Sequence, residues 1–229
     1  MAPPVVVRSK HTAQLGPRSA SRGFTLVELV VVVIIVGVMA SLAIPTITGQ
    51  LRSRRTQFVA KEVSNLYRNG RMRAMGRGSA VLIRFDRSVD QEGRFEVREA
   101  VRSGQANPNC DRLPVNSCTL TSWLPQNPDS MVIGQLTIAG RAELEGIRTR
   151  VKDPGNNDQT AMDVCFTPMG RAFMRYGQAN PFTPQTTVPR VKVSRVNATT
   201  QNPYGPSRWV LVLPNGNTRL GTATEDTTL

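Results

Sequence analysis

A run of twenty-one residues from Phe24 to Ile44 constrains this chain most, because it is almost wholly apolar and holds one carboxylate, Glu28. As a helix rising about 1.5 Å per residue, the run would measure roughly 31 Å, close to the ~30 Å hydrocarbon thickness of a bilayer. An ionised carboxylate inside such a helix is costly to insert. The run predicts one transmembrane helix over residues 24–45, in which Glu28 must have a purpose.

A cleavable secretory signal is the alternative interpretation. The first 23 residues carry four basic residues and no acidic one, and the small-residue sequence Ser-Leu-Ala ends at Ala43. The apolar run, however, is longer than the roughly 7 to 15 residues usual for the core of a signal. A removable signal would also gain nothing from the cost of burying Glu28. Both observations favour a permanent helix.

The sequence Gly-Phe-Thr-Leu-Val-Glu-Leu, from Gly23 onward, resembles the class III leader of type IV prepilins and type II secretion pseudopilins. Glu28 is the fifth residue counted from Phe24, and the apolar run ends in Pro45. In that family a membrane-bound prepilin peptidase cuts after the glycine and methylates the new amino terminus. The resemblance implies cleavage after Gly23, N-methylation of Phe24 and a mature chain of residues 24–229.

Cleavage would explain Glu28. The new amino group of Phe24 would be positively charged, and a carboxylate one helical turn away can neutralise it where the dielectric constant is low. In a helical array, Glu28 of one subunit can face the Phe24 amine of its neighbour and so set the register of assembly. The alternative is a carboxylate that only snorkels to the membrane–water interface and has no role in assembly.

The positive charge of the chain is concentrated in one stretch. The net charge is +13 and the sequence pI is about 11.1. Residues 52–87 hold ten Lys or Arg residues against Glu62 and Asp86, a net charge of +8. Such a balance indicates an anionic partner or a solvated helix face. Because basic residues lie on both sides of the apolar run, charge alone does not fix its orientation in the membrane.

Apolar residues continue after the membrane segment at helical spacing. They recur mostly three, four and seven residues apart, as on one face of an amphipathic helix, which we expect to end near Gly76 or Gly78. The predicted apolar face consists of Ile47, Leu51, Phe58, Val59, Val63, Leu66 and Tyr67.

Alternating apolar and polar residues predict strands in the remainder of the chain. Turn sequences at 167–170 and 214–217 predict antiparallel hairpins, the second through an Asn-Gly pair. The expected strands cover residues 80–86, 94–101, 131–139, 161–166, 171–176, 190–196 and 208–213.

A long helix followed by antiparallel strands is similar to the GspH/FimT family of pseudopilins and minor pilins. The hairpin at 166–173 and the final Trp209 strand with its turn carry this looser resemblance. It implies an α+β pilin fold, in which a long N-terminal helix, half in the membrane and half amphipathic, packs on an antiparallel β-sandwich. The expected parts are a leader (1–23), a transmembrane helix (24–45), an amphipathic helix (46–78) and a β domain (79–229).

Enzyme chemistry has little support in the sequence. The single histidine, His11, lies in the expected leader, so the mature chain would have no imidazole for a catalytic triad or a metal site. Walker loops, nucleophile elbows and Cys-x-x-Cys pairs are missing as well. We therefore expect no catalytic residue, no metal and no cofactor.

Three cysteines allow a disulfide in an oxidising compartment. Cys110 and Cys118 flank a short turn-prone sequence, and a bridge between them would stiffen the longest expected loop by about 2 kcal/mol. Two unpaired thiols are the alternative. Cys165, within an expected strand, is expected to pack as a small apolar residue, although a pairing with either loop cysteine remains open.

The basic residues also allow a DNA-binding hypothesis, with Arg71, Arg73, Arg77 and Arg219 as phosphate contacts. A solvated face, or pairing with acidic neighbours in a filament, is the simpler interpretation. DNA-uptake members of the family carry a Gly-Arg-x-Arg motif near the carboxyl end. The corresponding sequence here has Asn217 in place of the first arginine, which weakens the DNA hypothesis.

The resemblance implies a non-catalytic minor pilin or pseudopilin that acts in filament priming or assembly, or at the filament tip. The alternative is a DNA-binding minor pilin for DNA uptake. Expected partners are prepilin peptidase, other pilins or pseudopilins in a helical filament, and the inner membrane, with DNA as a lesser candidate. The subunit would cross the inner membrane once, place its domain in the periplasm and enter a pilus or pseudopilus, which can reach the cell surface. The sequence leaves open whether the machine is a type IV pilus or a type II secretion system.

Overall fold

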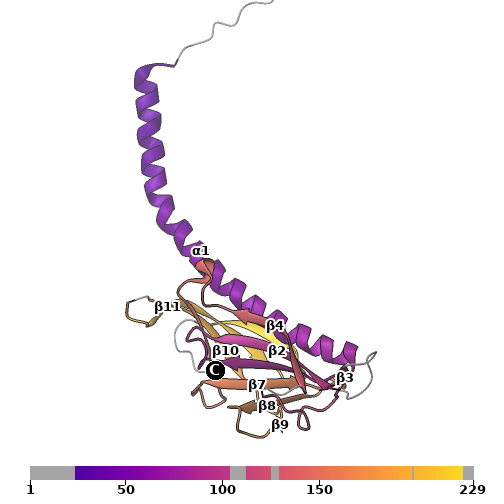
Figure 1. Cartoon of the computed structure of the whole chain (residues 1–229). Helices are drawn as coiled ribbons and strands as arrows, with labels where there is room; N and C mark the ends of the chain where they lie inside the picture. The colour runs from indigo at the N-terminus through magenta and orange to yellow at the C-terminus, as the bar shows by residue number, and fades with distance from the viewer. Residues whose placement is uncertain (1–23, 104–111, 125–128, 198, 224–229) are drawn as a thin grey trace, which may run out of the picture. The chain divides into compact units, whose positions relative to one another are not determined.

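The computed structural model describes residues 24–103, 112–124, 129–197 and 199–223, without the side chains of residues 42–52 and of a few residues beside the gaps. The chain divides into two units at residues 47 and 48, and each unit is described by itself. One helix, α1 (Leu26–Arg77), comes first, and the described strands all follow it (Figure 1). One helix followed by antiparallel sheets confirms the expected α+β class.

The part of α1 in the second unit is amphipathic. It ends at Arg77, where Gly78 at φ +67° donates its N–H to the carbonyl of Ala74 at 3.1 Å, so the expected end is confirmed. Phe58 is 51% exposed, and its expected place on the apolar face is wrong, because its position turns away from that of Val59. The buried face is formed by Thr56, Val59, Ala60, Val63, Ser64, Tyr67, Gly70 and Ala74.

Leu66, also expected on the apolar face, is partly buried and packs against the core. Ile47 and Leu51 belong to the same prediction but lie outside the described side chains.

The larger sheet has seven antiparallel strands in the order β3-β2-β1-β7-β8-β9, with β4 paired to β2. Five of these strands confirm the runs expected from alternation, and the short β3 and β9 were not predicted. The strands are β1 (Val81–Asp86), β2 (Arg94–Ser103), β3 (Arg112–Pro114), β4 (Ser130–Thr137), β7 (Ala161–Phe166), β8 (Ala172–Tyr176) and β9 (Thr183–Pro184).

The smaller sheet has five antiparallel strands in the order β12-β11-β10-β5-β6. Two of them, β10 and β11, confirm expected runs, although β11 begins five residues before the predicted start at 208. A short 3₁₀ helix, η1 (Ala142–Leu144), precedes β5. The strands are β5 (Ile147–Lys152), β6 (Asp158–Gln159), β10 (Arg190–Val196), β11 (Pro203–Val212) and β12 (Thr218–Ala223).

Side chains of α1 and of both sheets share one hydrophobic core. Val63 and Tyr67 come from α1, Phe85 comes from β1, and Val191 and Val210 come from the smaller sheet. Each of these five residues is fully buried. Burial of one such side chain contributes about 1.5 to 3 kcal/mol, so Val63 and Tyr67 help to attach the helix to the core.

Two Pro-x-Gly turns close the hairpins predicted at 167–170 and 214–217. Gly170 has φ +76° and Gly216 has φ +73°, a left-handed conformation in which glycine carries no steric penalty. In each turn the glycine N–H donates to the carbonyl three residues earlier, at 2.9 and 2.8 Å. The first turn joins β7 to β8 and the second joins β11 to β12, as expected.

The disulfide joins Cys118 to Cys165, with 5.9 Å between their Cα atoms, so the expected Cys110–Cys118 bridge is wrong. Cys165 lies opposite Leu82 on the face of the larger sheet that points away from the shared core. The segment after β3 packs there, and Trp123 donates its indole N–H to the carbonyl of Cys118 at 2.8 Å. Tertiary packing thus brings Cys118 to β7, and Cys110 lies outside the described residues.

Loss of the disulfide should destabilise the domain. Cys118 and Cys165 are 47 residues apart, and closing such a loop stabilises a fold by about 2 to 4 kcal/mol. We expect Cys118→Ser to lower the free energy of unfolding by that amount in denaturant titrations of the full chain in detergent. Cys110→Ser is the matched control and should change little. An equal loss in the Cys110→Ser variant would contradict the pairing.

Candidate functional site

The expected processing site lies at the start of α1. Gly23 lies outside the described residues, and Phe24, the first described residue, is 78% exposed. Thr25 caps the helix, because its Oγ1 accepts the N–H of Glu28 at 3.2 Å and its carbonyl accepts the N–H of Leu29 at 3.2 Å. This Thr-x-x-Glu pattern is typical of helix starts and was not used in the prediction. Glu28 therefore lies in the first turn, where the helix dipole favours a negative charge.

The first turns of α1 expose apolar side chains on all sides. Thirteen large apolar residues from Phe24 to Met39 are between 46% and 80% exposed. A helix that is apolar all round is normally covered by lipid or by other protein. In the described part of the chain, no helix is long and apolar enough to cross a membrane.

Two of the arginines named as candidates for DNA contact bind Glu99 on β2. The Glu99 carboxylate is 2% exposed and lies 2.7 Å from Arg73 Nη2 and 3.3 Å from Arg77 Nε. Ser79 donates its hydroxyl to the same carboxylate at 2.9 Å. These three donors satisfy a buried charge within the domain, and they attach the end of α1 to the larger sheet.

The protonation of Glu99 follows from these contacts. Burial alone would raise the pKa of the Glu99 carboxyl, but hydrogen bonds from Arg73, Ser79 and Arg77 outweigh it and hold the pKa below its ordinary value of 4.5. The carboxylate is therefore charged at neutral pH and pairs with both arginines.

Arg71 packs between the two hairpin turns. A Cβ atom at Gly216 would lie 2.6 Å from Arg71 Cδ, and one at Gly170 would lie 3.5 Å from Arg71 Nη2. Arg71 Nη1 also donates to Asn217 Oδ1 at 3.4 Å. The side chain thus contacts both Pro-x-Gly turns, and glycine at position 216 leaves the room that it needs.

The four arginines of the DNA hypothesis do not form one surface. Arg73 and Arg77 meet at Glu99, whereas Arg71 lies between the hairpin turns. Arg219 is exposed on β12, where it lies opposite Leu211 on the smaller sheet. A phosphate backbone that follows the helix would have to compete with Glu99 for Arg73 and Arg77.

A row of buried and partly buried charges on the larger sheet was not predicted. Glu96, Arg84, Asp163 and Arg175 lie directly opposite one another on β2, β1, β7 and β8. Arg84 binds Asp163 through two hydrogen bonds at 2.9 and 3.0 Å, and Arg175 Nη2 lies 2.7 Å from the same carboxylate. The available signal was a charged residue inside otherwise apolar strands. Buried pairs of this kind neutralise each other within the domain.

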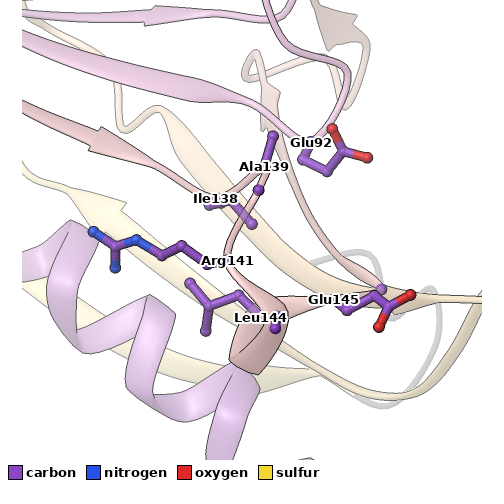
Figure 2. Close-up of a pocket in the computed structure, with 9 residues that line it drawn as sticks. Glu92, Ile138, Ala139, Arg141, Leu144 and Glu145 are labelled. Carbon is purple, nitrogen blue, oxygen red and sulfur yellow. The ribbon is translucent and has the colours of Figure 1, made fainter.

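A cavity of about 340 Å³ lies between the end of β4 and the start of β5 (Figure 2). Arg141 points toward α1, where its Nη1 lies 3.7 Å from Glu62 Oε2. The carboxylates of Glu92 and Glu145 point away from that guanidinium in Figure 2. The polar groups do not converge on one point, as a ligand site requires. Among the described residues, no three His, Cys, Asp or Glu side chains are grouped as metal ligands.

Replacement of Glu99 should destabilise the domain at neutral pH. Glu99→Gln removes a buried charge that has two arginine partners, and we expect a loss of about 1 to 3 kcal/mol, because the exposed arginines remain solvated. The lowered pKa makes this contribution complete above pH 4.5 and progressively lost as the pH falls toward the folded-state pKa. Unfolding curves of the two proteins should therefore converge in acid. A difference between the two proteins that does not shrink as the pH is lowered would contradict the role of the charge.

Comparison with known proteins bears on the start of α1. The family model of the prokaryotic N-terminal methylation motif matches residues 18–44, which include the Gly23–Phe24 junction and Glu28. No curated protein and no solved structure matches the chain. The motif implies processing by prepilin peptidase, anchoring in a membrane and assembly with other pilins, and it is typical of structural subunits. The chain therefore carries a type IV pilin-like prepilin leader.

Proposed function

We propose that the chain is a minor pilin or pseudopilin, a non-catalytic subunit of a type IV pilus or a type II secretion filament. The observation that carries this proposal is the methylation motif over residues 18–44. The larger part of the chain supports it through its architecture, since an amphipathic helix and two antiparallel sheets share one core. The two Pro-x-Gly hairpins favour a domain of the GspH/FimT type.

Maturation would begin at Gly23. Prepilin peptidase would cut the chain after this residue and methylate the amine of Phe24, which leaves a mature subunit of residues 24–229. The new amine would lie directly before the Thr25 cap, at the positive end of the helix dipole. Two positive contributions would then meet at one end of α1, and a carboxylate nearby is needed to balance them.

Glu28 would supply that carboxylate. It lies in the first turn of α1, so it can neutralise its own Phe24 amine before assembly and the amine of a neighbour after assembly. In an apolar environment an unpaired charge is expensive, and the pairing between subunits would therefore select one register. The exposed apolar side chains from Phe24 to Met39 would be covered by lipid first and by neighbouring helices in the filament.

The proposed maturation places the domain in an oxidising compartment outside the inner membrane. The apolar segment would cross the inner membrane once and leave the domain in the periplasm. Cys118 and Cys165 form a disulfide, the kind of bond that persists in the bacterial periplasm. The subunit would then enter a pilus or pseudopilus, either in filament priming or at the tip.

The assembly role is preferred over a DNA receptor because of the arginine contacts. Arg73 and Arg77 bind the buried carboxylate of Glu99, and Arg71 contacts the hairpin turns. Of the four arginines expected to contact DNA, Arg219 alone is exposed without an ion pair among the described residues. One phosphate contact is a weak basis for DNA affinity.

Cleavage should depend on Gly23. We expect Gly23→Val to leave the full precursor of 25.1 kDa uncut, because a branched side chain at the junction should not fit the peptidase. The measurement is the electrophoretic size of the membrane-bound protein in cells that contain prepilin peptidase. Gly16→Val, in the same leader, is the matched control and should be cut normally. A mature chain that starts at Ile44 would instead support a secretory signal.

Assembly should depend on the charge of Glu28. We expect Glu28→Val and Glu28→Gln to be inserted and cut normally but to enter filaments about tenfold less, because the amine of Phe24 loses its partner. Glu28→Asp keeps the charge and should retain more incorporation than Glu28→Gln. The measurement is the amount of the chain in sheared or overproduced filaments relative to the membrane fraction. Normal incorporation of Glu28→Val would refute the pairing.

A further inference from the structure

The outer face of the smaller sheet gathers basic side chains from three strands. Arg150 on β5 lies opposite Lys192 on β10, and Lys152 lies opposite Arg190. Arg219 on β12 joins the same face through β11. Directly opposed residues point to the same side of an antiparallel sheet, so these five residues form one surface, which we call the basic sheet face.

Trp209 on β11 lies within the basic sheet face and is covered by its cations. Lys192, which lies opposite, places Nζ 5.5 Å from the centre of the ring, and Arg190 places Cζ 5.7 Å from it. Trp209 is 8% exposed. The ring thus helps to position two cations. A partner on this surface would meet positive charges and not an exposed aromatic ring.

Among the described residues, the Asp158 carboxylate pairs with two of these cations. Asp158 on β6 lies 2.7 Å from Arg150 Nη1 and 3.1 Å from Lys152 Nζ. Even without Lys192, which has a further contact, the other four cations and Asp158 leave a net charge of +3 on this side of the sheet among the described residues. The opposite side of this sheet packs into the shared core, so the basic sheet face points away from α1. Such a surface fits a partner that spreads negative charge over an area.

We propose that the basic sheet face docks on the phosphate groups of anionic phospholipids in the membrane that holds α1. This inference rests on the proposed membrane anchoring, which would keep the domain close to the bilayer surface and so raise the effective concentration of headgroups. Each Lys or Arg near an anionic leaflet adds to the attraction, which decays within one Debye length. Docking would hold the subunit at the membrane before it enters a filament.

The details of the face favour lipid over nucleic acid. Single-stranded nucleic acids are held by stacking of bases on exposed aromatic rings, whereas Trp209 is covered by Arg190 and Lys192. Arg54 and Arg55 are exposed only ten residues after the apolar run and add positive charge next to the expected membrane surface.

Lysine acylation can test the docking on the full chain. The purified protein is reconstituted in nanodiscs of phosphatidylcholine alone or of phosphatidylcholine with phosphatidylglycerol, and labelling of each lysine is followed by mass spectrometry. We expect labelling of Lys152 and Lys192 to slow about fivefold or more in the anionic discs. Lys61, exposed on α1, is the internal control and should change less.

A pair of charge-reversal variants makes the test specific. Arg190→Glu, within the basic sheet face, should restore the labelling of Lys152 and Lys192 in anionic discs. Arg171→Glu is the matched control, because it makes the same charge change at an exposed position of the turn between β7 and β8. It should keep the protection. Equal loss of protection in both variants would overturn the assignment to this face.

Other outcomes separate this inference from the proposed function. Equal labelling in both kinds of disc, with the chain inserted, would overturn the docking and leave the pilin role intact. A chain that does not stay with either disc would overturn the membrane anchoring and the docking together. Equal or greater protection by duplex DNA, added to neutral discs at physiological salt, would overturn the choice of lipid.

Discussion

Burial of one face of α1 between Thr56 and Ala74 is the interaction on which the domain depends. Val63 and Tyr67 on that face are fully buried against side chains of both sheets, so neither sheet has a complete core without the helix. The contact of Arg73 and Arg77 with Glu99 then fixes where the helix ends.

The positive charges of the domain fall into two groups, those paired with internal carboxylates and those on the basic sheet face. Arginines at the end of α1 satisfy Glu99, and Arg84 and Arg175 satisfy Asp163 within the larger sheet. Paired in this way, these residues are held to internal carboxylates and are poorly placed for an external partner. The basic sheet face keeps a net positive charge, so part of the basic character of the chain stays at the surface of the smaller sheet.

Local patterns in the sequence predicted most strands and both hairpins, whereas contacts between distant residues were not accessible. Alternation predicted β1 and β10, but β5 was overlooked although Ile147 and Val151 alternate with basic residues in the same way. The disulfide was misassigned because Cys110 is near Cys118 in sequence, while the partner lies on β7. Spacing alone could not show that Glu99 would meet Arg73, since the contact depends on how β2 packs against α1. The processing motif was predictable because Gly23, Phe24 and Glu28 are close in sequence.

If the chain is a processed subunit of a filament, as we propose, its mature form must occur in assembled filaments. The most direct measurement is the intact mass and the N-terminal peptide of the chain recovered from purified pili or pseudopili. We expect a chain within those filaments that begins at N-methylated Phe24 and keeps the Cys118–Cys165 disulfide. A chain that is absent from the filaments, or that is found there with an unmethylated or different first residue, would contradict it.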